Sequence, residues 1–283
     1  MLPALWLLLA CGHSGGKSVP SGPPAAEEGK LPIGPPLVTP GERMSYRLSL
    51  QGVSLATFGF TVGEVSDLGG KQVIAVEGHA KSVGIADMLA RIDDRFTSWI
   101  DIETGRSRRF QTAEYETNSK TNVEHVVADF AAREGDRVPV TFRMNDAPPT
   151  PEPQKVTHPD VWDYNTFLVA LRAWEQPPGS KVGVEVFRSR YLWHVDMTIR
   201  GREKIHTDLP DLAEVTALRL DAHMYKLDRD GGKYPNSEAR DLSIWISDDD
   251  GRVPLRTTAR TDYGDIKMDI IEYQPGAGQR LRL

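Results

Sequence analysis

Two His-x-Asp pairs could each supply two ligands to a metal ion: His194 with Asp196, and His206 with Asp208. Imidazole nitrogens and carboxylate oxygens are common metal ligands, and on a β-strand residues i and i+2 point to the same face. The face that carries His194 also carries arginines at positions 188 and 190, which is typical of a polar, solvated face. We therefore expect structural or surface roles for these pairs, and neither a metal site nor a cofactor.

Acidic residues form a second group with potential chemistry. The stretch Asp248–Gly251 resembles the start of a calcium loop, but an EF-hand spreads its ligands over about 12 residues and ends on Glu, so we expect a polar hairpin turn. Asp93 with Asp94, and Glu114 with Glu116, could act as acid–base pairs, although such pairs are common on surfaces. The sequence has no phosphate-binding loop or His-Glu-x-x-His motif, and we expect a non-catalytic protein.

The single cysteine, Cys11, can form neither an internal disulfide nor a cysteine-based zinc site. It follows an apolar run at 1–10, which is shorter than the ~20 residues of a membrane span but fits the ~7–15 residues of a signal-peptide core. Leu8-Leu9-Ala10-Cys11 resembles a bacterial lipobox, in which the signal peptide is cut just before a cysteine that receives lipid. An ordinary buried thiol is the alternative. We predict that 1–10 is a lipoprotein signal peptide and that Cys11 is lipidated.

Residues 12–40 are rich in Gly, Pro and Ser and have no sustained hydrophobic period, which predicts a flexible tether. Two or more acyl chains, such as palmitate, on Cys11 would anchor the protein stably in a membrane. Gly12, and not Asp, follows the cysteine, which favours export to the outer membrane over retention in the inner one. We therefore expect a lipid-anchored protein of the outer membrane that faces the periplasm or the cell surface.

The composition is that of one large globular domain, which we place at 41–283. Hydrophobic residues make up 39% and charged residues 26% of the 283, a balance with no signature of disorder. The formal net charge is -6, and no basic stripe is present of the kind that nucleic-acid backbones require. We expect no nucleic-acid partner.

Within this domain, apolar and polar residues alternate with the period of a half-buried β-strand. The run at 54–62 places Phe58 and Phe60 on one face. The long run at 186–201 places the following residues on one face: Phe187, Tyr191, Trp193, Val195, Met197 and Ile199. Further strands are expected at 43–51, 72–79, 96–102, 105–116, 122–131, 137–143, 215–227, 241–247, 253–262 and 265–273.

One helix is expected at 161–174, capped by Asp160, with Asp163 in its first turn and Pro177–Gly179 beyond its end. Its apolar stripe consists of Tyr164, Phe167, Leu168, Leu171 and Trp174. A weaker helical turn is expected at 84–91. Many strands with one helix predict a mainly β fold: a large curved antiparallel sheet or half-open barrel whose open face the helix covers.

Three stretches of this domain together resemble one protein family. They are a Gly-Glu strand that leads to a Tyr (Gly41–Tyr46), a mid-chain helix with Leu171-Arg172 near its end, and an Ile-Trp hairpin that runs into Pro-Leu-Arg (Ile244–Arg256). In this order they are similar to the DUF3108 family of bacterial envelope proteins. The resemblance implies a fold similar to that of periplasmic lipoprotein carriers, a half-open antiparallel barrel lined by apolar side chains, and implies no activity.

If the interior of such a half-barrel is open, large aromatic and Met side chains would suit an adaptable lipid-like ligand. The candidate ligand-binding residues are Phe58, Phe60, Tyr191, Trp193, Met197 and Ile244. If the interior is filled, the same residues form the core beneath the helix. The sequence therefore leaves two hypotheses: an outer-membrane lipoprotein that binds a hydrophobic ligand or envelope component, and an interaction lipoprotein that scaffolds an envelope complex.

Overall fold

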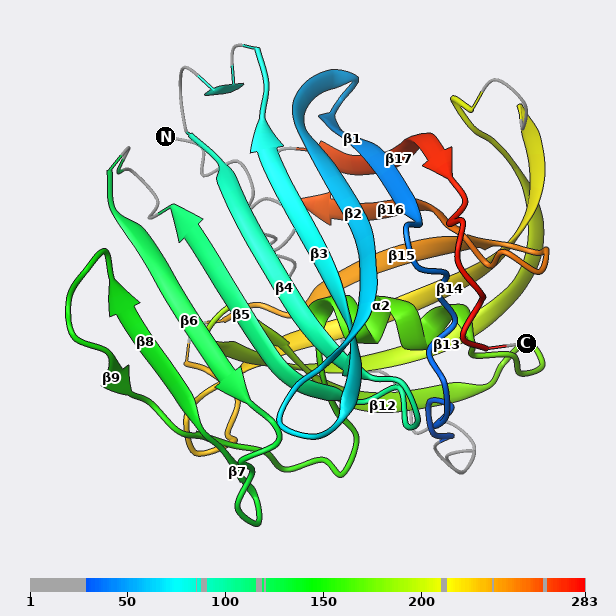
Figure 1. Ribbon diagram of the computed structural model, residues 1–283. Coiled ribbons are helices and arrows are strands. Elements are labelled where there is room, and N and C mark those ends of the chain that lie inside the picture. Colours follow the sequence, from blue (N-terminus) through cyan, green and yellow to red (C-terminus); the bar gives the residue numbers. More distant parts are fainter. Residues whose placement is uncertain are drawn as a thin grey trace, which may run out of the picture.

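The computed structural model describes residues 29–84, 86–87, 91–115, 119, 121–209, 213–235, 237–261 and 264–282. One 15-stranded sheet dominates it, and one helix lies within the curl of this sheet (Figure 1). The expected mainly β fold class is confirmed, with one helical element in the part of the chain that the structure describes. The sheet is strongly curved but does not close into a barrel.

The first half of the chain contains β1 (Arg43–Leu50), β2 (Val53–Asp67), β3 (Gln72–Ser82), β4 (Asp93–Asp101), β5 (Ser107–Tyr115), β6 (Val123–Asp129), β7 (Arg137–Val138), β8 (Val140–Met144), β9 (Thr150–Pro151) and β10 (Gln154–Lys155). The second half contains β11 (Val161–Asp163), α2 (Tyr164–Arg172), β12 (Lys181–Arg188), β13 (Tyr191–His206), β14 (Glu214–Leu227), β15 (Arg240–Ser247), β16 (Pro254–Thr261) and β17 (Gly264–Gln274).

The strand order shows how the chain builds the sheet. From β1 in the middle, antiparallel neighbours follow in sequence through β2 to β6 and on to β8 and β9 at one edge. The chain then crosses to the opposite edge, where β11 pairs in parallel with β12, and returns strand by strand until β17 pairs with β1. The first and last strands of the domain therefore lie side by side.

The two ends of the sheet overlap, so that β12 has both faces buried. Val184 and Val186 pack in the cluster that contains α2, whereas Phe187 packs with Phe110 and Val126 from β5 and β6. Residues 182–187 are all buried for this reason. Because burial on both faces requires a covering layer on each, the sheet is better described as a scroll than as a half-barrel.

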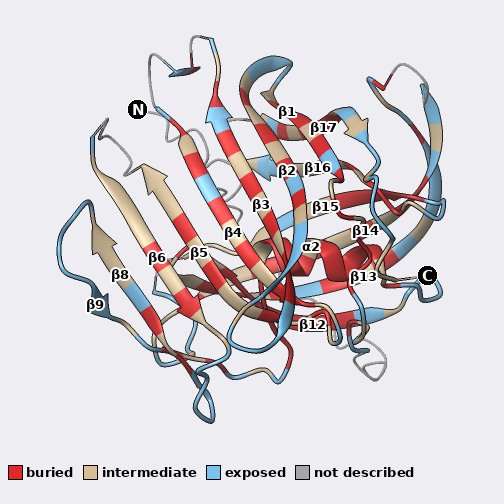
Figure 2. Cartoon of the chain, viewed as in Figure 1, coloured by how far each residue is buried: buried red, intermediate tan, exposed pale blue. Residues whose placement is uncertain are grey.

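Helix α2 fills the inside of this scroll, and Figure 2 shows it buried along most of its length. Val169 packs in a cluster that combines β1 to β4 with residues of β16 and β17, whereas Phe167 and Leu171 pack in a cluster on β12 to β15. The helix therefore joins the two main apolar clusters and occupies the space that an open carrier would leave free.

The helix starts three residues later than expected, and its cap is Asp163. The Asp163 carboxylate accepts hydrogen bonds from the backbone N–H and the hydroxyl of Thr166, at 3.0 and 2.8 Å. The predicted cap at Asp160 is wrong, because residues 161–163 are drawn into the sheet as β11 and Asp160 binds Arg106 at 2.6 Å instead.

The run at 186–201 is not one strand but the end of β12, a tight turn at Ser189 and Arg190, and the start of β13. A turn of two residues pairs Arg188 with Tyr191 and thereby places them on the same face, so that Phe187 shares the opposite face with Leu192. The expectation that Phe187 and Tyr191 point the same way is therefore wrong.

The N-terminal boundary also differs from the expected one. Residues 29–40 lie against the domain, with Leu31 and Val38 each 1% exposed, so this part of the expected tether belongs to the folded unit. The expected signal peptide, Cys11 and the earlier part of the tether lie outside the described residues, as do Glu116 and half of the expected helical turn at 84–91. No helix within the described ranges combines the length and the apolar character that crossing a membrane requires.

Candidate functional site

The scroll contains an apolar cavity of about 100 Å³ between α2 and the strands β12 to β17. Two of the predicted ligand-binding residues, Trp193 and Ile244, line it, and the other lining side chains include Tyr164, Phe167 and Leu168 from the helix. Ligand sites typically enclose about 300–1,000 Å³. The cavity is therefore a packing defect beside the helix, and not a chamber of the size of a lipid.

The remaining predicted ligand-binding residues do not converge on this cavity. Phe58 and Phe60 are 8% and 4% exposed and belong to the cluster that combines β1 to β4 with β16 and β17. Met197 is 1% exposed in the second-half cluster, and Tyr191 is half-buried at the start of β13. The structure thus separates the six residues into two cores. That they bind a ligand stays a prediction, and the packing favours the filled-core alternative.

A much larger concavity, of about 1,380 Å³, lies on the outer face of β12 to β17 and β1, and we call it the outer groove. The long hairpin β13–β14 forms one end of it. Its ladder shifts register between Ile199 and Gly201, where Gly201 has φ +131°, a backbone conformation that favours glycine. Beyond this bulge the hairpin tip turns toward β16 and β1, where Asp208 pairs with Arg47 and the His206 carbonyl accepts from Arg256 at 2.7 Å.

The outer groove is lined by charges of both signs. They are Arg47, Lys181, Arg200, Arg219, Arg260, Lys267, Asp196, Asp208, Asp221, Asp241, Asp265 and Asp269. Asp221 is the centre of a network on its floor: it binds Arg200 at 2.8 Å, Arg219 at 2.9 Å and the hydroxyl of Ser243 at 2.7 Å. Burial opposes ionisation of Asp221, but these hydrogen bonds outweigh it and lower the pKa of the carboxyl. Lys181 and Arg260 form no ion pair with any described residue, so they are free to bind a partner.

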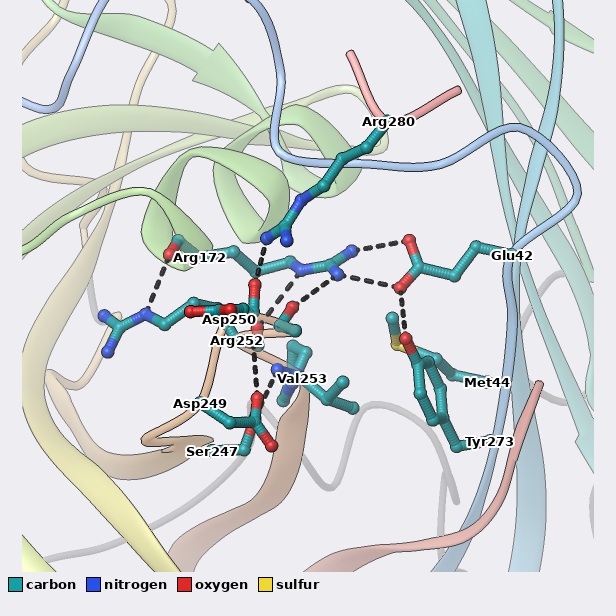
Figure 3. Close-up of polar contacts among 12 residues, drawn as sticks. Glu42, Met44, Arg172, Ser247, Asp249, Asp250, Arg252, Val253, Tyr273 and Arg280 are labelled. Atoms are coloured by element: carbon teal, nitrogen blue, oxygen red, sulfur yellow. Dashed lines mark hydrogen bonds and ion pairs between the residues drawn. The ribbon is translucent and has the colours of Figure 1, made fainter. Parts of the chain in front are cut away.

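The three sequence stretches of the family resemblance meet at one buried cluster (Figure 3). Arg172, in the last turn of α2, binds both oxygens of Glu42 at 2.9 and 2.7 Å, and the two side chains are 3% and 2% exposed. The guanidinium also donates to the carbonyls of Gly251 and Arg252, at 2.8 and 3.1 Å. Arg252 reciprocates by donating to the carbonyl of Arg172 at 3.0 Å. Because Arg172 and Glu42 are buried and each binds polar partners, this cluster holds the helix in place.

A row of three carboxylates crosses the inner face of β4, β5 and β6. Glu114 pairs directly with Glu124, and Asp94 occupies the position next to Glu114 on β4, because Arg95 pairs with Ala113. Like charges directly opposite each other destabilise a sheet. The end of β12 and the turn after it supply the opposing charges. Arg188 lies 3.6 Å from Glu114, and Arg190 lies 3.9 Å from Glu124.

This row carries shifted pKa values. Burial, reinforced by the charge of Glu114, raises the pKa of Asp94 from 3.8 to about 7, against the effect of a hydrogen bond from the Tyr115 N–H. Burial also raises the pKa of Glu124, which Arg190 partly offsets. The sequence pairs Asp93–Asp94 and Glu114–Glu116 did not reveal this arrangement, because the pairing runs across strands. The period-two pattern that aligns Asp94 with Phe96 was the available signal.

The predicted surface roles of the His-x-Asp pairs agree with the structure. His194 Nε2 lies 3.1 Å from Asp196 Oδ1, its ring stacks on Tyr225, and Asp208 is used by Arg47. Within the part of the chain that the structure describes, no three His, Cys, Asp or Glu side chains are grouped as metal ligands would be. The stretch at 248–251 is a turn, in which Asp249 accepts from the hydroxyl of Ser247 at 2.8 Å and from the N–H of Arg252 at 3.1 Å.

Comparisons with known proteins agree with this architecture. The solved structures that match this chain do so at very low sequence identity. A beta-barrel-like protein of the domain of unknown function DUF1849 from Brucella abortus is 8% identical, with a TM-score of 0.53 over 85% of this chain and 99% of that chain. This similarity supports the fold alone.

The other two structures are more distant. A candidate exported protein with a YmcC-like fold from Bacteroides fragilis is 7% identical, with a TM-score of 0.36 over 86% of this chain and 99% of that chain. A candidate lipoprotein from Parabacteroides distasonis is 10% identical, with a TM-score of 0.31 over 87% of this chain and 100% of that chain. A comparison with curated proteins finds no match.

The sequence profile of one family matches residues 44–271, and this range contains nearly all of the scroll. The matched range includes the carboxylate row, the helix with Arg172 and the β15–β16 turn, and the family's description is "Protein of unknown function". The match confirms the resemblance read from the three sequence stretches: the chain belongs to the DUF3108 family.

Proposed function

We propose that the protein is a non-catalytic envelope lipoprotein that binds another envelope component through the outer groove of its domain. The observation that carries this proposal is the contrast between two concavities: about 100 Å³ inside the scroll and about 1,380 Å³ outside it. A scaffold with a filled core therefore fits the geometry better than a carrier of a lipid in its interior.

The chemistry of the outer groove suggests the kind of partner. Its walls carry both cations and carboxylates, and most of them already form ion pairs with each other. A partner segment with charges of both signs would bind such a wall by exchanging some of these pairs, which gives specificity more than affinity. We therefore favour a polar protein segment over an apolar or a uniformly charged ligand.

The first prediction concerns the lipid anchor at Cys11. In cells fed with labelled palmitate, the unchanged chain should incorporate label and sediment with membranes, because acyl chains on Cys11 bury apolar surface in the bilayer. The Cys11→Ser variant should incorporate none and be released by cell fractionation. Membrane association of the Cys11→Ser variant equal to that of the unchanged chain would contradict the predicted anchor.

The second prediction concerns partner binding in the outer groove. A photo-crosslinking residue at Ser243 or Thr258 should give a discrete crosslinked product in cells, because both positions line the groove. The same residue at Val65, which is exposed on β2 and lies outside the groove lining, is the matched control and should give none. Adding Lys181→Glu and Arg260→Glu to the chain that carries the probe should lower the yield of crosslinked product severalfold. These substitutions reverse the charge of the two groove cations that form no ion pair with a described residue.

Organic extraction separates the two functional hypotheses in the same material. The purified Cys11→Ser chain should release no stoichiometric lipid by mass spectrometry and should not bind a fluorescent fatty-acid probe. One lipid per chain, with no groove-dependent crosslink, would overturn the scaffold proposal in favour of an internal carrier.

A further inference from the structure

A group of cations and aromatic rings lies where β13, β14 and β15 meet their turns, outside the groove. Lys226 is central to it: its ammonium lies 3.2 Å from the ring centre of Tyr191 and 4.0 Å from that of Tyr234. Attraction between an ammonium and the electron-rich faces of two rings holds the side chain in place. We call this group the cation–aromatic cluster, defined by Arg190, Tyr191, Lys226, Arg229 and Tyr234.

Positive charge is concentrated in this cluster. Arg190 and Arg229 act on Lys226 together with Arg240 from β15, and burial with these three arginines lowers the pKa of Lys226 to about 8. Lys226 forms no ion pair with any described residue. Glu124 and Glu152 pair with two of the arginines, whereas the Lys226 ammonium has no carboxylate partner among the described residues.

The carboxylates that contact this cluster are already engaged. Glu152 pairs with Arg229, which also donates to Gln154 at 3.2 Å and to the Arg190 carbonyl at 2.8 Å. Glu124 accepts from the hydroxyl of Ser189 at 3.4 Å and lies 3.9 Å from Arg190. Burial raises the pKa of Glu124, and the charge of Arg190 partly offsets this effect.

The cluster is accessible and pre-formed. Tyr234 is 39% exposed, and Lys226, Arg190 and Arg229 are half-buried, so a ligand can reach the ammonium while the rings and arginine contacts keep it positioned. Arg190 lies 4.5 Å from the ring centre of Phe142 and donates to the Tyr191 hydroxyl at 3.2 Å. Pre-positioned cations lower the ordering cost of binding an anion.

We propose that the cation–aromatic cluster binds a phosphate group carried by an envelope component. Arginine forks suit phosphate geometry, the ammonium supplies a further charge-assisted donor, and the tyrosine rings border the group that bears the phosphate. This site is distinct from the outer groove and does not depend on the function proposed for it.

The experiment uses the full-length Cys11→Ser chain, so that its own anchor does not interfere. One arm titrates inorganic phosphate by calorimetry, and the other measures co-sedimentation with phosphatidylcholine vesicles with and without phosphatidylglycerol. Saturable binding in the first arm supports a free phosphate compound, and binding only to phosphatidylglycerol vesicles supports a lipid head group. Binding in neither arm overturns the proposal.

Two substitutions test the role of Lys226. Lys226→Met should weaken binding about tenfold, the loss expected for one charge-assisted hydrogen bond. Lys226→Arg should retain binding. Lys71→Met is the matched control, because Lys71 is an exposed lysine that pairs with Glu103 at 3.6 Å, and it should bind as the unchanged chain does. Unfolding curves of all variants check the fold, and equal binding by Lys226→Met and the control would also overturn the proposal.

The pH dependence gives an independent readout. The groups that face Lys226 are Arg190 in the β12–β13 turn, Arg229 after β14, Arg240 on β15, Glu124 on β6, and the rings of Tyr191 and Tyr234. The arginines keep their charge across the range, and the pKa of Lys226 is about 8, so the lysine is the group expected to change most between about pH 7 and 9. As the pH rises over this range, the phosphate affinity of the unchanged chain should fall relative to that of Lys226→Arg. If the ratio of the two affinities stays constant with pH, the ammonium does not contact the ligand.

Discussion

Replacing Arg172 by Met should lower the free energy of unfolding by about 3–5 kcal/mol, the loss typical when one partner of a buried ion pair is removed. The substitution leaves the Glu42 carboxylate, 2% exposed, with the Tyr273 hydroxyl at 3.2 Å as its only side-chain donor among the described residues. It also removes donors from the carbonyls of Gly251 and Arg252 in the β15–β16 turn. Urea unfolding followed by tryptophan fluorescence measures the loss.

The double variant Glu42→Gln with Arg172→Met tests whether the cost comes from the unpaired charge. It should be more stable than the sum of the single losses predicts, because the second substitution removes the carboxylate that the first one leaves alone. Lys204→Met is the matched control: Lys204 pairs with Glu214 at the same 2.7 Å, but the side chains are 73% and 49% exposed, so stability should hardly change. Similar unfolding midpoints for Arg172→Met and Lys204→Met would contradict a structural role for the buried pair.

This cluster shows what the sequence could and could not predict. The Gly-Glu strand, the Leu-Arg helix end and the Ile-Trp hairpin were all recognisable, but nothing in their spacing indicates that Glu42 and Arg172 touch across 130 residues. Strand positions were predictable because alternation is a local property. Contacts between distant strands depend on the curvature of the whole sheet, which no local pattern records.

The turn at Ser189 illustrates a second limit of prediction from the sequence. Turns of two residues usually carry Gly, Asn or Asp, because these residues tolerate positive φ. Ser189 adopts φ +54° without such a signal, so one long strand was the natural reading, and the faces of Phe187 and Tyr191 were assigned to the wrong sides of the sheet.

The candidate sites also differ from what the sequence predicted, because they depend on contacts between distant strands. Tyr191 and Trp193 were singled out as apolar residues, but the charges that surround Tyr191 come from β14 and from the turns. The outer groove depends on a bend at Gly201 that a single sequence does not reveal. The filled interior could be foreseen only as an alternative, because an apolar stripe on a helix is the same whether the helix covers a cavity or fills it.

Replacing Asp94 by Asn should stabilise the protein at about pH 8 by roughly 2–4 kcal/mol and leave it unchanged near pH 4. The native pKa of Asp94, about 7, lies above its unfolded value of 3.8. The native state therefore holds the proton more tightly, and the contribution of Asp94 to stability is fully present below about pH 4 and is lost as the pH rises through 7. Asparagine stays neutral across this range and still accepts from the Tyr115 N–H, which lies 3.0 Å away.

Its neighbour Asp93 is the matched control, because its pKa moves in the opposite direction. A hydrogen bond from His79 at 2.7 Å, opposed in part by burial, lowers the pKa of Asp93. Asp93 thus contributes stability above its unfolded pKa that is lost as the pH falls, so Asp93→Asn should destabilise the protein near neutral pH. Urea midpoints measured between about pH 4 and 8 should diverge in opposite directions for the two variants. Parallel profiles would mean that Asp94 is ionised in the native sheet, and that Arg188 compensates the carboxylate row fully.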